Sequence, residues 1–120
     1  MRNEIERIKE EIKKLKKGKG RQIATLKVGN QEFSIRATYH SLVRMIERNV
    51  DEYVVSGTIL SLGNDRLMKY RSNNREVMII NKTKNVSVVF AIVKNRIIII
   101  TVLDNSDVYV IDETSIEVLK

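Results

Sequence analysis

Three apolar segments rich in β-branched residues follow one another near the C-terminal end, and they constrain the fold more than any other feature of the sequence. They span residues 76–81, 86–94 and 96–103, with turn-forming residues between them. Consecutive strands joined by connections this short pair as an antiparallel meander. Residues 97–100 are apolar at every position, so we expect the last of these strands to lie centrally with both faces covered.

Further strands are expected on both sides of this meander. Residues 66–71 form an apolar run that we interpret as an additional strand, and residues 108–111 predict a shorter one. Residues 116–119 fit either a last strand or a tail. The segment 104–120 carries a net charge of −4, which suits a solvated tail or an internal cover for a basic surface.

A hairpin and two helices are expected before these strands. Residues 23–28 and 32–35 flank a glycine-asparagine pair, which is typical of a β-hairpin turn. Residues 38–48 have helical periodicity, and residues 51–61 predict a second helix, which Asp51 caps. The fold class is therefore α+β, with helices packed on a twisted antiparallel sheet.

Residues 2–17 predict an amphipathic N-terminal helix. Its apolar stripe has the spacing of a short coiled-coil seam and consists of Ile5, Ile8, Ile12 and Leu15. Because two heptads are too short for a stable isolated coiled coil, the stripe packs on its own domain, on a second copy in a homodimer, or on another partner. Gly18 and Gly20 end the helix and provide a hinge. We expect two parts, the helix and hinge over residues 1–20 and one α+β domain over residues 21–120.

Composition excludes several classes of site. The chain of 120 residues has no cysteine, so it has neither a disulfide nor a thiolate metal site. A single histidine excludes any zinc site with two or more histidines. We predict no metal and no cofactor. We find neither a secretory leader nor an apolar run long enough to span a bilayer, and we therefore expect a cytoplasmic protein without membrane contact.

The charge of the chain is strongly basic and unevenly distributed. The formal net charge is +7, and residues 1–21 carry +5 of it. A basic surface of this kind suits a polyanionic partner such as RNA. Solubility alone is the competing explanation for the same charge.

The helix over residues 38–48 separates polar and apolar side chains cleanly. At 100° per residue, Arg44, Arg48 and Glu47 fall within about 80° of His40 around the helix axis. The opposite arc is apolar and consists of Leu42, Val43, Met45, Ile46 and Val50. The apolar arc must face the sheet, which leaves the polar arc to face solvent or a groove.

The polar arc suits metal-free cleavage of RNA. A histidine exchanges a proton near neutral pH, and two arginines one turn apart grip a phosphate and stabilise charge on it. Glu47 acts as a base or orients an arginine, and Tyr70 and Arg71 are expected to face the same groove. The structural alternative is a surface ion pair beside a capping or packing histidine.

The run Tyr39-His40-Ser41-Leu42-Val43-Arg44-Met45-Ile46-Glu47-Arg48-Asn49-Val50 resembles a His-x-x-x-Arg-Met-x-Glu-Arg-Gly-Ile motif. This motif opens a family of small bacterial and phage domains related to RelE-type and BrnT-type toxins. The resemblance covers about residues 33–103, and the segment ending Ile99-Ile100-Thr101-Val102 looks like the family's closing strand.

The resemblance implies a RelE-like fold and activity as a metal-independent endoribonuclease. It assigns catalysis to His40, Arg44, Glu47 and Arg48, and it adds Thr101 to Tyr70 and Arg71 as RNA-contacting residues. An antitoxin is then a further expected partner. Two alternatives remain open. One is a non-catalytic phage or mobile-element protein that binds and inhibits a host protein, and the other is a nucleic-acid-binding regulator.

Overall fold

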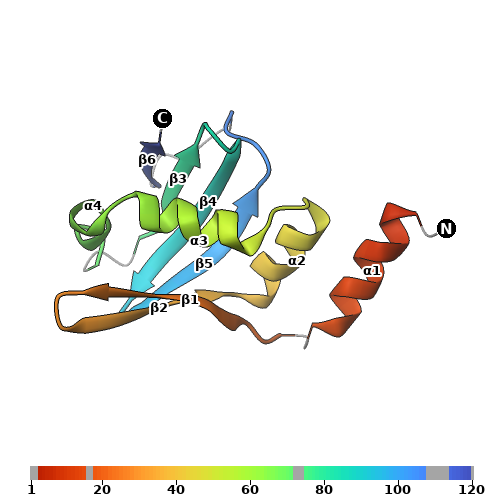
Figure 1. Ribbon diagram of the computed structural model, residues 1–120, viewed down its shortest axis with the longest axis horizontal. Coiled ribbons are helices and arrows are strands. Elements are labelled where there is room, and N and C mark those ends of the chain that lie inside the picture. Colours follow the sequence, from red (N-terminus) through yellow and green to blue (C-terminus); the bar gives the residue numbers. More distant parts are fainter. Residues whose placement is uncertain (1–2, 16–17, 72–74, 108–113, 120) are drawn as a thin grey trace.

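The computed structural model describes residues 3–15, 18–71, 75–107 and 114–119 (Figure 1). Along the chain, an N-terminal helix is followed by a β-hairpin, three helices, a meander of three strands and a last strand. The helices are α1 (Glu4–Lys14), α2 (Tyr39–Glu47), α3 (Glu52–Ser61) and α4 (Asn64–Met68). The strands are β1 (Arg21–Val28), β2 (Gln31–Ala37), β3 (Val77–Asn81), β4 (Val86–Val93), β5 (Arg96–Leu103) and β6 (Ser115–Leu119). The predicted α+β class is confirmed.

The six described strands form one mixed sheet in the order β1-β2-β5-β4-β3-β6. The hairpin β1–β2 and the meander β3–β4–β5 are antiparallel, as the short connections predict. The expectation of a wholly antiparallel sheet is wrong, because β2 pairs with β5 and β3 pairs with β6 in parallel. Both parallel pairs join strands that are distant in sequence, where no short turn constrains their direction.

The helices α2 and α3 lie over the same face of this sheet (Figure 1). The core between them and the sheet includes Leu42 and Met45 from α2 and Val55 and Ile59 from α3. The strand β5 is central, as predicted, but its burial alternates. Ile97 and Ile99 face the helices and are fully buried, whereas their neighbours are only partly buried, so the expectation of two fully covered faces is wrong.

The predicted strand over residues 66–71 is wrong, because this segment contains the end of α4 and the turn after it. Leu67 and Tyr70 are both buried, and a spacing of three residues places them on one side of a helical turn. A strand would instead have placed them on opposite faces. A short apolar run does not distinguish the two structures by itself.

The N-terminal helix α1 lies beside α2 at the edge of the domain (Figure 1). Leu15, which follows it, packs against the core, while Ile8 and Ile12 are only partly covered. Ile5 is 63% exposed. One end of the apolar stripe therefore docks on its own domain, and a homodimer through the stripe stays a prediction.

The predicted final segment over residues 116–119 is a strand, β6, and its single carboxylate side chain, Glu117, is buried. Glu117 Oε1 accepts hydrogen bonds from Arg66 Nε at 3.2 Å and from Lys69 Nζ at 3.3 Å. The two cations belong to α4 and the turn after it, so the ion pairs hold β6 to the helical layer. This part of the acidic segment pairs with two basic groups that stay about half exposed. The predicted strand over 108–111 lies outside the described residues.

The ion pairs of Glu117 predict a pH-dependent contribution to stability. Burial by itself raises the pKa of Glu117, but hydrogen bonds from Arg66 and Lys69 outweigh it and hold the pKa below its ordinary value of 4.5. A lowered folded-state pKa means that the ionised carboxylate stabilises the fold above pH 4.5, and that this contribution is lost as the pH falls.

We therefore expect Glu117→Gln to lower the free energy of unfolding at pH 7 by about 1–2 kcal/mol, since both cations are half exposed. Urea unfolding measured from pH 7 downward should show this difference from the wild type shrinking as the pH falls through 4.5. Glu32→Gln, on the exposed start of β2, is the matched control and should change little. A loss that is the same at every pH would contradict this role of the ion pairs.

Candidate functional site

The helix α2 is fixed at its start by Thr38, the residue that joins it to β2. The Thr38 hydroxyl donates to the carbonyl oxygen of Ile99 on β5 at 3.1 Å and accepts from the backbone amide of Ser41 at 3.0 Å. Its backbone amide donates to the same Ile99 carbonyl at 3.3 Å. A single threonine thus caps α2 and attaches it to the central strand.

The apolar arc predicted for α2 faces the sheet and α1. Leu42, Met45 and Val50 are buried in the core, while Val43 and Ile46 are partly covered. The prediction that this arc packs inward is confirmed. The polar arc is left at the surface of the domain.

The four residues predicted to be catalytic differ in their contacts: three of them have partners within the chain, and His40 has none among the described residues. Arg44 Nη1 donates to Glu47 Oε1 at 2.6 Å, and the two side chains are 36% and 40% exposed. Arg48 Nη1 donates to the carbonyl oxygen of Val102 on β5, so Arg48 attaches the end of α2 to the sheet. Within the described residues, exposed His40 has neither a hydrogen bond nor an ion pair. His40 is therefore the member of the set that is free to meet a ligand.

The residues predicted to share a groove with His40 lie elsewhere. Tyr70 is buried, and Arg71 lies over the Phe33 ring and donates to Asn95 before β5. Because Arg48 contacts the other end of β5, Arg71 and Arg48 are separated by roughly 20 Å along the strand. Thr101 pairs with Val89 on the sheet face away from α2. The structure does not bring Tyr70, Arg71 and Thr101 together with His40.

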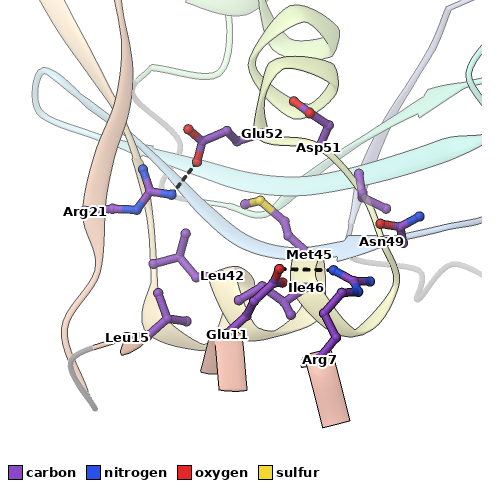
Figure 2. Close-up of a pocket in the computed structure, with 11 residues that line it drawn as sticks. Arg7, Glu11, Leu15, Arg21, Leu42, Met45, Ile46, Asn49, Asp51 and Glu52 are labelled. Atoms are coloured by element: carbon purple, nitrogen blue, oxygen red, sulfur yellow. Dashed lines mark hydrogen bonds and ion pairs between the residues drawn. The ribbon is translucent and has the colours of Figure 1, made fainter. Parts of the chain in front are cut away.

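A cavity of about 500 Å³ lies between α1, β1 and the turn from α2 to α3 (Figure 2). Its apolar lining includes Leu15, Leu42, Met45 and Ile46. Two ion pairs, Arg7–Glu11 and Arg21–Glu52, lie at its charged walls. Both arginines are neutralised by carboxylates of this chain, and His40 does not line the cavity, so this cavity is separate from the polar arc.

Two arginines outside the predicted site lie on neighbouring strands of the sheet, Arg36 on β2 and Arg96 on β5. The alternation along each strand indicates which face each side chain occupies. However, no local pattern reveals that β2 and β5 are neighbours, since 58 residues separate Ala37 from Arg96. The missing information was the pairing of the strands.

Among the described residues, no group of three or more histidine, aspartate or glutamate side chains is arranged to hold a metal ion. The same part of the chain contains no helix long and apolar enough to cross a membrane.

Comparisons with models of protein families, with curated proteins and with solved structures find no match. The function must therefore be inferred from the geometry of the chain itself.

The contacts of α2 predict that its two arginines differ in their effect on stability. Arg48→Ala leaves the Val102 carbonyl without its charged donor and should lower the free energy of unfolding by about 1–3 kcal/mol. Arg44→Ala removes only the exposed ion pair with Glu47 and should lower the free energy of unfolding by less than about 1 kcal/mol. Urea unfolding of the two variants measures this difference, and an equal loss in both would contradict a structural role for Arg48.

Proposed function

We propose that this chain is a RelE-like domain of toxin type that binds RNA at the start of α2 and cleaves it without a metal ion. The observation that carries the proposal is the exposed imidazole of His40, which has no partner within the described residues. The order of hairpin, helices and antiparallel meander supports the RelE-like assignment. The net charge of +7 supports a polyanionic partner.

In this proposal His40 transfers a proton during attack of a ribose 2′-hydroxyl on the adjacent phosphate. The attack forms a bond from the 2′-oxygen to phosphorus and breaks the bond from phosphorus to the 5′-oxygen. A base removes the 2′ proton, and an acid delivers a proton to the leaving 5′-oxygen. Histidine is suited to either role because it exchanges protons near neutral pH.

Arg44 is the nearest candidate on the same helix for contact with the phosphate. Its ion pair with Glu47 is about two-fifths exposed, so solvent weakens it and a phosphate competes with the carboxylate for the guanidinium. Arg48 is engaged with the Val102 carbonyl and contributes by positioning α2. The proposed working set is therefore His40 and Arg44, which is smaller than the four residues predicted from sequence.

Labelled single-stranded RNA incubated with the protein in EDTA tests the proposal. We expect the wild type to bind and cut the RNA, and His40→Ala to bind it but cut at least about a hundredfold more slowly, the usual effect of losing a general acid or base. Thr83→Ala, at the exposed turn between β3 and β4, serves as the control. Binding without cleavage by the wild type would reduce the function to RNA binding, and absence of binding would overturn the proposal.

A further inference from the structure

The described arginines differ sharply in whether this chain provides them with a partner. Ion pairs or hydrogen bonds engage Arg7, Arg21, Arg44, Arg48, Arg66 and Arg71, and Arg75 also has an interaction. Arg36 and Arg96 have none with any part of the chain that the structure describes. The two guanidinium groups without a partner also belong to neighbouring strands.

Strand register places these two side chains on the same face of the sheet. In the parallel pair β2–β5, Ser34 is opposite Arg96 and Arg36 is opposite Ile98. Arg36 and Arg96 are therefore offset by two residues on adjacent strands, which puts their Cα atoms roughly 8 Å apart. Residues two apart share a face, so both side chains leave the sheet on the side away from α2 and α3.

The two arginines line a recess of about 230 Å³ at the corner where β2 ends and α2 begins, called here the arginine pocket. Tyr39 and Thr38 line it from the start of α2, and Gly20 lines it from the segment before β1. No carboxylate is among the described residues that line the pocket. Its charge is therefore purely positive, unlike that of the larger cavity beside α1.

Close packing of the backbone forms one wall of the arginine pocket. A Cβ atom at Gly20 would lie 2.1 Å from the carbonyl oxygen of Ala37, so only glycine fits at this position. The segment before β1 therefore runs directly against the end of β2. This backbone contact forms a fixed part of the recess, and the side chains of Arg36, Tyr39 and Arg96 complete its lining.

Adjacent like charges in a recess without a counter-charge favour an anion from outside the chain. Two guanidinium groups that line one recess suit the non-bridging oxygens of a phosphate, which accept hydrogen bonds from arginine. The aromatic ring of Tyr39 at the same recess suits an unpaired base, because bases stack on aromatic side chains in single-stranded RNA complexes. A duplex keeps its bases stacked inside and does not present one to such a ring.

We propose that the arginine pocket binds one phosphodiester group of single-stranded RNA, with Arg36 and Arg96 on the phosphate oxygens and Tyr39 against the neighbouring nucleotide. The identity of the ligand as RNA rests on the proposed function, whereas the preference for a phosphate group rests on the pocket alone. Tyr39 immediately precedes exposed His40. Tyr39, which lines the pocket, therefore connects it along the chain to the residue that carries the proposed catalytic imidazole.

A fluorescent single-stranded octamer of uridylate, titrated at several salt concentrations, measures the contribution of the pocket. We expect the double variant Arg36→Gln, Arg96→Gln to bind at least tenfold more weakly than the wild type. The slope of log affinity against log salt should fall by about 0.7 for each phosphate that the variant no longer neutralises. The control Lys82→Gln, Lys84→Gln removes the same charge from the exposed turn between β3 and β4, and its affinity should change less than twofold.

A second arm uses inorganic pyrophosphate and follows the side-chain resonances of the arginines by NMR. We expect Arg36 and Arg96 to shift and Arg66 to remain unchanged. If pyrophosphate shifts the resonances of Arg36 and Arg96 but the protein does not bind RNA, the pocket is supported and the proposed function is overturned. RNA binding weakened equally in the two double variants, with no pyrophosphate shift at Arg36 or Arg96, would overturn the pocket and leave RNA binding intact.

Discussion

The hydrogen bonds of Thr38 to the Ile99 carbonyl are the constraint on which the arrangement of the candidate site depends. They join the end of β2, the start of α2 and the middle of β5 at one residue. Because β5 is central in the sheet, these hydrogen bonds fix α2 to a strand that has a neighbour on each side. Arg48 makes a second attachment at the Val102 carbonyl, so both ends of α2 are held over the same strand.

This attachment determines which polar groups are available for chemistry. Arg48 is engaged in holding the helix, and Arg44 and Glu47 partly neutralise each other at the surface. His40 lies in the first turn, next to the corner that Thr38 creates. Arg36 and Arg96 approach the same corner from the sheet, because the parallel pairing that ends at Ala37 and Ile99 brings their strands together. Thr38 thus joins the helix that carries the exposed imidazole to the strand that carries Arg36, one of the two arginines without partners.

The elements defined by local patterns could be predicted from sequence. The alternation and short turns of β3, β4 and β5 predicted the meander, and helical spacing predicted that Leu42 and Met45 face inward. The prediction for the segment after Gly63 was wrong, because a short apolar run fits a strand as well as one helical turn. Where prediction succeeded, the decisive interactions are local or are repeated over enough residues to be recognised.

The composition of the site could not be predicted in the same way, because it depends on contacts between distant segments. The engagement of Arg48 by a carbonyl on β5 and the meeting of Arg36 with Arg96 both follow from neighbours that are far apart in sequence. Helical periodicity placed four polar residues on one arc, but it carries no information about which of them the sheet engages. Tyr70 and Arg71 were wrongly predicted to lie with His40, because the sequence does not show which distant segments they contact.

Backbone amide shifts during titration with single-stranded RNA, measured by NMR over the whole chain, test most directly whether the corner at Thr38 is the binding site. We expect the largest changes to cluster there, in Gly20, Arg36, residues 38–41 and Arg96. The ion-paired contact between α4 and β6, where Arg66 and Lys69 meet Glu117, should stay unchanged. Changes centred on α4 and β6, with none at the corner, would contradict this placement of the site.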